Sequence, residues 1–256
     1  TWNTRAISLE SVQAYIREAE MLERLGVQPF LCVCDNGSRD GAAEELRALE
    51  RGLQVPHRFI YNAVNRGNCA ARNQIIDYAR EVAADYLLFM DGDIEVVPFS
   101  SFAMLRYLEG HGAGVGGIGA NSAAYTASRA GTMPYLYSLS GLKVQATDLV
   151  AWTQYGMFRR EVFDSGVRFD EQPPFNGPGW GFEDNDLAFQ MAVRGFENHR
   201  FFGMIYLHRS AHSSIRNLRR QSIDVRRLCE QRKQYLIRKW KSTEPICHGP
   251  LDRKSV

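Results

Sequence analysis

The sequence contains no hydrophobic run long enough to cross a membrane. A spanning helix needs about 18 or more consecutive apolar residues, and no stretch of the 256 residues approaches that length. No signal peptide is visible either. The chain opens on Thr1 rather than on a methionine, as a fragment would, and whether residues precede Thr1 is left open. We therefore expect a soluble protein.

A large net charge and a regular cysteine pattern are also lacking. The net charge of +2 is too small to argue for a nucleic-acid partner. The five cysteines follow no recurring spacing, and the second pair of ligands that a zinc site needs is missing. Cys32 and Cys34 are expected to share one face of a strand as small buried hydrophobes. Reduced thiols suit the cytosol, so we expect a cytoplasmic protein.

The first 95 residues alternate predicted strands with predicted helices. Short apolar runs predict buried strands at 29–34, 58–62 and 85–90. Helices are predicted at 9–25, 42–51 and 70–84. This alternation predicts an α/β fold with a mostly parallel sheet flanked by helices.

The rest of the chain continues the pattern less regularly. Further helices are predicted at 99–109, 183–194 and 214–240, and further strands at 112–120, 147–158 and 201–207. Residues 121–145 show no clear period and are left unassigned. The basic helix at 214–240 is expected either to lie on anionic lipid as a peripheral membrane contact or to pack its apolar side on the domain. We favour packing.

Polar loops follow the three predicted strands of the first half, near Asp35, Asn65 and Asp91. Because ligands bind at the carboxyl ends of strands in such sheets, these loops are predicted to converge on one rim. In the third loop, Asp91 and Asp93 are spaced i, i+2 around Gly92. Two carboxylates so placed can hold a divalent cation and neutralise a diphosphate. A solvated Asp-Gly turn is the alternative.

Residues 176–186 join a Gly/Pro-rich loop to a predicted helix start that carries Glu183, Asp184 and Asp186. Acids at this place also oppose the helix dipole, so simple capping is the alternative. Trp180 lies in the loop, and a tryptophan face stacks well on a sugar ring. A neighbouring carboxylate can deprotonate an acceptor hydroxyl. We therefore favour a functional role for this segment.

Three other polar positions are weaker candidates. Asp35 can accept the imide N–H of uracil, but by sequence alone a plain Asx turn is favoured. Arg72 can contact a phosphate or a nucleobase of a ligand. The alternative is a surface arginine in an ordinary helix start. His208 and His212 follow a predicted strand, which makes a metal ligand plausible, with His208 nearer the strand end.

Taken in order, the segments TWN, DNGSRDG, NRGNCAARN, FMDGDIEVVP, MFRREVFDSGVRFDE and GWGFEDNDL resemble a GT-A-fold glycosyltransferase of the family 2 kind. Residues 175–220 also resemble the C-terminal part of the beta-1,4-galactosyltransferases. The resemblance implies a GT-A domain over 1–213, built on a single Rossmann-like mixed sheet, and a basic helical extension over 214–256. Residues 1–95 would bind the nucleotide and 96–213 the acceptor.

The resemblance also implies roles for individual residues. Those that would contact substrate are Thr1, Asn3, Asp35, Arg72, Asp91, Gly92 and Trp180. The metal, Mn²⁺ with Mg²⁺ as the alternative, would be held by Asp91, Asp93 and His208. Glu183 would orient the acceptor, and Asp184 would be the catalytic base.

Two positions depart from the resembled pattern. Ile205 stands where the galactosyltransferases carry a methionine ligand, three residues before the histidine. Phe182 stands where a glycine is usual. The first departure concerns a second soft ligand of the metal. The second concerns the shape of the donor or acceptor pocket.

The expected function is transfer of a hexosyl or N-acetylhexosaminyl group from a UDP-sugar, with inversion. The acceptor would be a glycan, a lipid-linked molecule, a peptide or a small molecule. A retaining transferase and a non-catalytic nucleotide-sugar binding module are the alternatives. A nucleotidyltransferase is disfavoured, because no glycine-rich phosphate loop with a basic residue lies near the N-terminus. The sugar, the acceptor and the oligomeric state stay open.

Overall fold

The computed structural model describes residues 1–122, 136–137, 143–145, 153–179, 181–208 and 222–240. The helices are α1 (Arg5–Arg24), α2 (Ala42–Glu50), α3 (Asn68–Glu81), α4 (Ser100–Glu109), α6 (Arg160–Asp164), α7 (Glu183–Val193) and α9 (Val225–Trp240). The strands are β1 (Leu31–Asp35), β2 (His57–Tyr61), β3 (Tyr86–Met90), β4 (Ile94–Glu95), β5 (Val115–Ser122), β6 (Leu136–Tyr137), β7 (Lys143–Gln145), β8 (Tyr155–Arg159) and β9 (Glu197–His208). Within these ranges, no helix has both the length and the apolar character that a membrane crossing requires.

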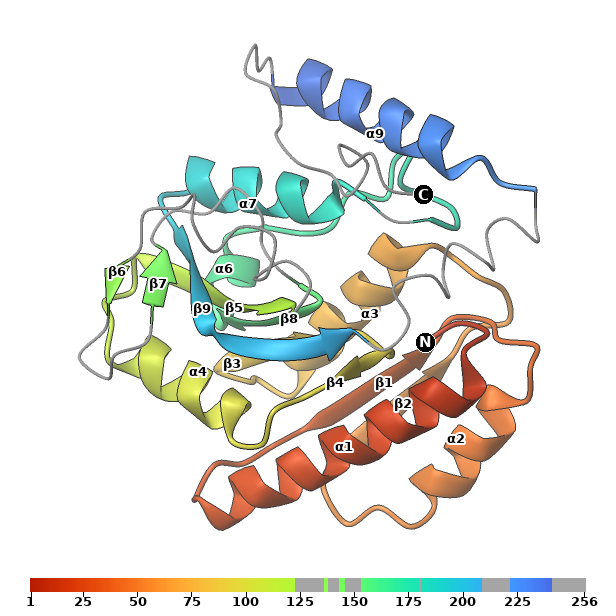
Figure 1. The fold of residues 1–256 in the computed structure, drawn as a ribbon, viewed down its shortest axis with the longest axis vertical. Coiled ribbons are helices and arrows are strands. Elements are labelled where there is room, and N and C mark those ends of the chain that lie inside the picture. Colours follow the sequence, from red (N-terminus) through yellow and green to blue (C-terminus); the bar gives the residue numbers. More distant parts are fainter. Residues whose placement is uncertain (123–135, 138–142, 146–152, 180, 209–221, 241–256) are drawn as a thin grey trace.

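The described strands pair in two sheets (Figure 1). β1 and β2 are parallel, with Leu31 opposite His57 and Asp35 opposite Tyr61. The larger sheet follows the order β3-β8-β5-β9-β7-β6, and β4 pairs with β9 beside this path. β5 and β9 run parallel, while the other pairs in that sheet are antiparallel. The predicted mixed α/β arrangement is confirmed, but the described strands pair as two sets rather than as one sheet.

The start of the chain occupies the edge of β1 that faces away from β2. The nitrogen of Thr1 donates to the carbonyl of Cys34 at 2.7 Å, and the N–H of Asn36 donates to the carbonyl of Thr1 at 2.9 Å. This is the hydrogen-bond pattern of a residue pair in a parallel sheet. Thr1 therefore lies beside the carboxyl end of β1, where Figure 1 places the N-terminus.

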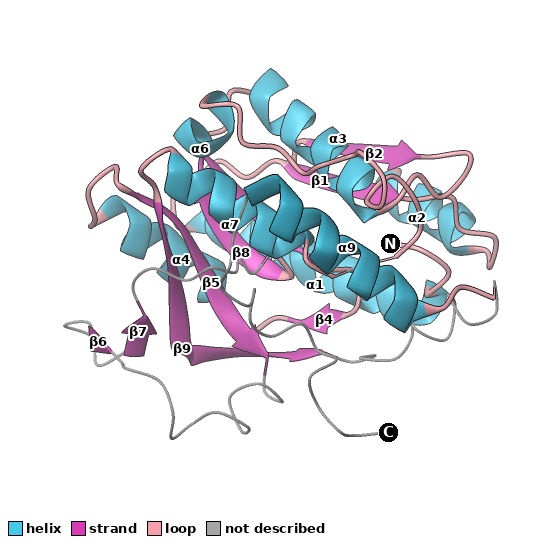
Figure 2. Ribbon diagram, turned by 90° about the horizontal axis from the view of Figure 1, so that it is seen from above, coloured by secondary structure: helices cyan, strands magenta, loops and turns pink. Residues whose placement is uncertain are grey.

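Helices cover the sheets and close the core. α1 and α3 pack on β1 and α2 packs on β2, with α3 on one side of these strands and α1 and α2 on the other (Figure 1). α4 packs on β5 and β8, and α7 packs on β9. Figure 2 shows the same layers from above.

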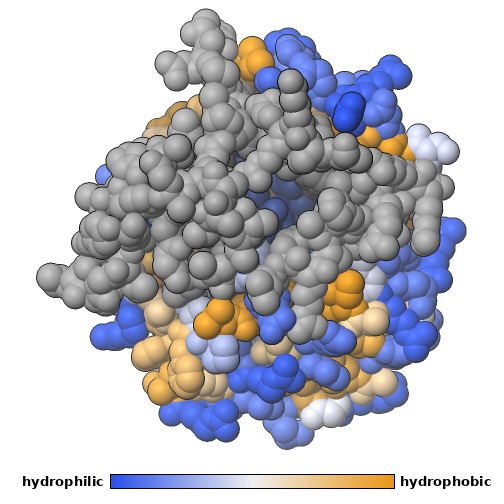
Figure 3. All heavy atoms as spheres, viewed as in Figure 1, coloured by the Kyte–Doolittle hydropathy of each residue, from blue (hydrophilic) through white to orange (hydrophobic). Residues whose placement is uncertain are grey.

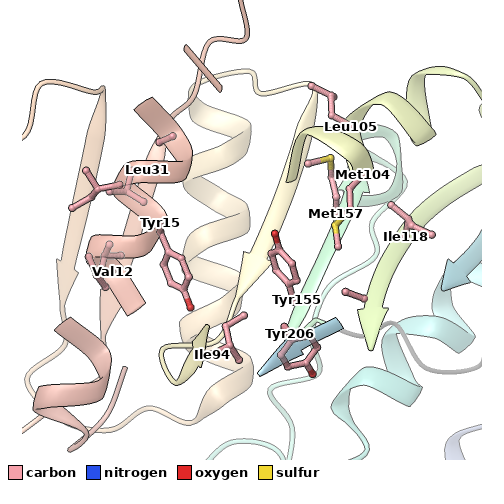
Figure 4. Close-up of a cluster of buried hydrophobic side chains, with 14 of the residues drawn as sticks. Val12, Tyr15, Leu31, Ile94, Met104, Leu105, Ile118, Tyr155, Met157 and Tyr206 are labelled. Carbon is pink, nitrogen blue, oxygen red and sulfur yellow. The ribbon is translucent and has the colours of Figure 1, made fainter. Parts of the chain in front are cut away.

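The main core joins α1 and α4 to strands of both sheets. Figure 4 shows Tyr15 of α1, Ile94 of β4, Tyr155 of β8 and Tyr206 of β9 meeting in its centre. All four side chains are buried. Burying a large apolar side chain stabilises a fold by about 1.5–3 kcal/mol, so this cluster fixes the carboxyl end of β3 relative to α1 and β9.

The predicted helices and strands are observed with shifted ends, and the structure adds α6, β4, β6 and β7, which the sequence did not predict. One prediction is corrected. The prediction of a single helix over 214–240 is wrong, because Ser222 has a φ of 58° and breaks any helix there. α9 begins after Asp224, whose side chain accepts a hydrogen bond from the N–H of Arg227 at 3.1 Å. An aspartate in this position caps a helix. Residues 214–221 and 241–256 lie outside the described residues.

α9 packs its apolar side on the domain. Cys229, Arg232 and Leu236 are buried, and Trp240 stacks on Phe189 of α7 with ring centroids 5.7 Å apart. This supports the packing interpretation of the basic helix. A contact with a membrane surface stays a hypothesis.

Candidate active site

The buried guanidinium of Arg72 links three carboxylates. Arg72 belongs to α3, and its Nη2 donates to Asp91 Oδ1 at 2.9 Å. Its Nη1 donates to Asp184 Oδ1 at 3.4 Å and lies 3.8 Å from Glu183 Oε1. Burial alone would lower the pKa of Arg72. The neighbouring carboxylates favour the charged guanidinium more strongly, so the pKa is raised. Three segments far apart in sequence therefore meet at one cation.

Asp184 lies at the start of α7, where burial changes its acidity. Burial raises the pKa of Asp184 to about 6, with Glu183 and Asp91 adding to the rise and Arg72 opposing it. The Oγ1 of Thr153 donates to Asp184 Oδ1 and also opposes the rise. A carboxylate with a pKa near neutrality is suited to accept a proton at physiological pH.

Glu183 is held from two sides. The Nδ2 of Asn68 donates to Glu183 Oε1 at 2.9 Å. Arg232 of α9 lies on the other side, with Nη1 3.6 Å from Glu183 Oε2. Both side chains of this pair are almost fully buried, at 1% exposure for Arg232 and 7% for Glu183. The preceding residue, Phe182, has a φ of 67°, a region that favours glycine, so the departure noted at this position carries backbone strain.

The end of β3 presents Asp91, Gly92 and Asp93 beside Arg72. The N–H of Asp91 donates to the carbonyl of Gln154 at 2.8 Å, and its carbonyl accepts from the hydroxyl of Tyr15. A Cβ at Gly92 would lie 2.7 Å from Thr1 Cγ2, so glycine is required for the chain start to pack there. Asp91 and Asp93 are partly exposed.

Asp35 lies on the same rim. Its Oδ1 accepts from Thr1 Oγ1 at 3.2 Å and its Oδ2 from the N–H of Ser38 at 3.2 Å. The side chain of Asp35 therefore caps the turn after β1 through Ser38, one residue farther along than an Asx turn, and it also contacts Thr1. Asn3 donates from its N–H to Ser38 Oγ at 2.9 Å and accepts from the N–H of Arg39 at 2.7 Å.

The loop after β2 is tied to the loop after β1 through Asn36. The Nδ2 of Asn36 donates to Asn65 Oδ1 and to the carbonyl of Gly67, both at 3.0 Å. Gly67 in turn approaches the Gly/Pro-rich loop, since a Cβ on it would lie 2.7 Å from the carbonyl oxygen of Gly177. The predicted convergence of the three loops on one rim is therefore observed.

The residues suited to hold a metal ion lie around β4. Ile94 pairs with His208 in the antiparallel contact of β4 with β9, which brings the backbone of His208 beside Asp93. Among the described side chains, no three His, Cys, Asp or Glu residues gather closely enough to hold a metal by themselves. Two carboxylates together with substrate phosphates are nevertheless a donor set that suits Mg²⁺ or Mn²⁺. The available side chains fit such an ion.

The structure thus brings together Thr1, Asn3, Asp35, Arg72, Asp91, Gly92, Asp93, Glu183 and Asp184. Trp180 and His212 lie outside the described residues, as does the side chain of His208. Sequence reasoning missed Thr153, Asn68 and Arg232, which contact the catalytic candidates. Asn68 stands inside a recognised motif, whereas Thr153 and Arg232 carry no local signal.

Fold and site together define an α/β protein whose candidate site lies where the strands of residues 1–95 end. The family model of glycosyl transferase family 2 matches residues 28–166, more than half of the chain. The chain belongs to this family. No curated protein sequence matches it significantly.

Several solved structures share its fold. The mannosyltransferase PcManGT from Pyrobaculum calidifontis, in complex with GDP-Man and Mn²⁺, is 15% identical with a TM-score of 0.64, covering 93% of this chain and 62% of that one. TarS 1–349 from S. aureus, in complex with UDP, is 11% identical with a TM-score of 0.58, covering 95% and 70%. GalNAc-T7 with UDP, GalNAc and Mn²⁺ is 12% identical with a TM-score of 0.54, covering 75% and 39%.

These likenesses establish the fold. The GT-A fold predicted from the sequence is confirmed. The chain spans only 62% of the length of the mannosyltransferase.

Proposed function

We propose that this chain transfers a hexosyl or N-acetylhexosaminyl group from a UDP-sugar to an acceptor hydroxyl, with inversion. The observation that carries the proposal is the bridge from Asp91 through Arg72 to Asp184. The guanidinium of Arg72 contacts Asp91, in the candidate diphosphate site, and also Asp184, the candidate base. Family membership supports the reaction class, and the nucleotides in GT-A structures of similar fold support a sugar-nucleotide donor.

Asp184 acts as the base in this proposal. It takes the proton of the acceptor hydroxyl, whose oxygen forms a bond to the anomeric carbon. The bond from that carbon to the nucleotide diphosphate breaks, and the diphosphate leaves with the bonding electrons. Attack from the face opposite the leaving group inverts the anomeric centre. The raised pKa of Asp184 suits proton transfer near neutral pH.

Residues at the strand ends bind the donor. Asp35 and the backbone of Thr1 and Asn3 contact the nucleobase of the donor. Arg72 neutralises part of the negative charge of Asp91 on the donor side and of Asp184 on the acceptor side. Asp91 contacts the ribose or the metal, with Gly92 leaving room for Thr1.

Asp91, Asp93 and His208 would hold the metal ion, Mn²⁺ or Mg²⁺. When bound, the ion neutralises charge that develops on the departing diphosphate. The Mn²⁺ in the structures of PcManGT and GalNAc-T7 supports a divalent cofactor.

The acceptor side includes Trp180, which would stack on the sugar, and Glu183, which would orient the acceptor. The resemblance of 175–220 to the beta-1,4-galactosyltransferases belongs to this part of the proposal. Glycan, lipid-linked, peptide and small-molecule acceptors all fit the proposal.

A panel of sugar nucleotides tests the function directly. UDP- and GDP-linked hexoses and N-acetylhexosamines are added with Mn²⁺, with Mg²⁺ and with EDTA, and the melting temperature and donor hydrolysis are measured. A metal-dependent rise in melting temperature and slow hydrolysis with a UDP-sugar are expected. A response to GDP-sugars alone would contradict the UDP assignment, and no response to any donor would overturn the proposal.

Two alternatives are decided by related measurements. Hydrolysis or transfer of the sugar argues against a non-catalytic binding module. The anomeric proton of the product, observed by NMR, separates inversion from retention.

A further inference from the structure

The three carboxylates at the start of α7 differ in the side chains that they contact. Asp184 faces Arg72 and Thr153, and Glu183 lies between Arg72 and Arg232. Asp186 turns away from the site. Its side chain is 1% exposed and accepts from Lys239 Nζ at 2.9 Å and from Trp240 Nε1 at 2.8 Å. One helix start therefore joins the candidate active site to α9.

α9 also lies along the loop that leads into α7, of which residues 173–179 and 181 are described. In Figures 1 and 2, α9 runs beside this loop and α7. Arg232 donates from Nε to the carbonyl of Pro174 at 3.2 Å and from Nη1 to the carbonyl of Gly181 at 3.5 Å. Its guanidinium stands 4.9 Å from the ring centroid of Phe175. One side chain of α9 therefore contacts both ends of the loop.

Two glycines allow the loop to approach α9 this closely. Gly179 and Gly181 have φ values of 134° and 108°. A Cβ at Gly181 would lie 3.2 Å from Cys229 Sγ, and a Cβ at Gly179 would overlap Leu228. Side chains of α9 thus fill the space that side chains of the loop would otherwise need.

The pairing of Arg232 with Glu183 is electrostatic rather than hydrogen-bonded. Glu183 Oε2 is buried and accepts no hydrogen bond from the described residues. The nearest cation on that side is Arg232, at 3.6 Å. Removing one partner of a buried ion pair leaves the other charge uncompensated. Glu183 would then turn from its present place.

We propose that Arg232 is a positioning residue that sets the orientation of Glu183 and of residues 173–179 and 181, so that α9 completes the acceptor side of the site. This inference rests on the proposed function, in which Glu183 orients the acceptor. The donor side does not depend on Arg232, because Asp35, Asp91 and Asp93 lie on other elements. Figure 3 shows hydrophilic residues on the exposed side of α9. Arg232 is among the buried residues of the helix, so the proposed positioning role belongs to the buried side of α9.

The test separates acceptor effects from donor effects. Arg232→Met, Arg232→Lys and the control Arg226→Met are prepared in the full chain; Arg226 lies exposed on the same helix. UDP binding with Mn²⁺, hydrolysis of the active UDP-sugar, and transfer to a panel of methyl glycosides are measured. Arg232→Met is expected to lower the ratio of transfer to hydrolysis at least tenfold, while the Kd for UDP changes less than twofold. Arg232→Lys is expected to restore part of the ratio, since it keeps the charge.

A double-mutant cycle identifies the partner. If Arg232 acts through Glu183, Arg232→Met combined with Glu183→Gln loses no more transfer than Glu183→Gln alone. Effects that multiply, or a transfer-to-hydrolysis ratio unchanged in Arg232→Met, would overturn the inference.

Hydrogen exchange supplies a readout that needs neither donor nor acceptor. Amides of residues 181–186 are expected to exchange at least tenfold faster in Arg232→Met than in Arg226→Met. Equal exchange would show that Arg232 does not hold this segment. If the unmodified chain binds no sugar nucleotide, the proposed function fails, while the exchange result still decides whether α9 holds the loop.

Discussion

Arg72 donates a 2.9 Å hydrogen bond to Asp91, joining the first turns of α3 to the end of β3. The same guanidinium reaches Asp184 on α7. The proposed donor and acceptor sides of the candidate site are therefore connected through one buried side chain. Its removal should affect stability and binding together.

Arg72→Met is expected to lower the free energy of unfolding by about 3–5 kcal/mol, because breaking a buried ion pair leaves unpaired buried charge. Urea denaturation measures the change. Arg58→Met is the control, since its pair with Glu81 is exposed and exposed pairs contribute little. Equal losses in the two variants would contradict a central role for Arg72.

Asp184→Asn is expected to reduce transfer about 100- to 10,000-fold, the usual contribution of a general base. Nucleotide binding should change little, because the amide keeps the size of the side chain and remains beside Arg72. Initial rates and calorimetric titration with UDP and Mn²⁺ measure the two quantities. Transfer that survives in this variant would place the base elsewhere.

The rate of transfer should depend on pH through Asp184. Its pKa is raised to about 6, so below that pH the carboxyl is protonated and cannot accept the proton of the acceptor. The rate is expected to rise tenfold per pH unit below about pH 6 and to level off above it. Nucleotide binding measured over the same range is the control. A flat profile from pH 5 to 8 would count against Asp184 as base.

The raised pKa has a consequence for stability as well. The folded protein holds this proton more tightly than the unfolded chain does. The contribution of Asp184 to stability is therefore complete at low pH and is lost as pH rises through about 6.

Asp93→Ala is expected to abolish the Mn²⁺-dependent part of nucleotide binding, since a carboxylate ligand is lost. Titration of UDP with and without Mn²⁺ measures it. Asp85→Ala is the matched control, because Asp85 precedes β3 and is exposed, at the opposite end of the strand from Asp91. An unchanged response to Mn²⁺ in Asp93→Ala would remove Asp93 from the metal site.

Gly67→Ala is expected to destabilise the protein by about 1–3 kcal/mol, the usual cost of an unfavourable backbone conformation. Its φ is 89°, and the added Cβ would lie 2.7 Å from the carbonyl oxygen of Gly177. Gly112→Ala is the control, because nothing lies within 4 Å of a Cβ there. Thermal unfolding compares the two, and similar melting temperatures would argue against close contact of the loops.

Much of the fold could be predicted from local pattern. Short apolar runs ended by polar residues located β1, β2 and β3, because strands covered by other elements on both faces need continuous hydrophobicity. The basic helix was placed too early, since the break at Ser222 depends on a backbone conformation that composition does not reveal. The ends of β9 were also misplaced, because its pairing with β5 extends it beyond its most apolar part.

The candidate site was also predicted only in part from the sequence. The sequence alone determined which residue types stand at the strand ends and at the start of α7, and so identified Asp35, Asp91, Asp93, Glu183 and Asp184 as candidates. Only the tertiary structure decided which of them share a partner: Arg72 between Asp91 and Asp184, Arg232 behind Glu183, and α9 on Asp186. The reason is physical. Residue type and local spacing follow from the order of the chain, whereas the pairing of buried charges depends on how distant elements pack.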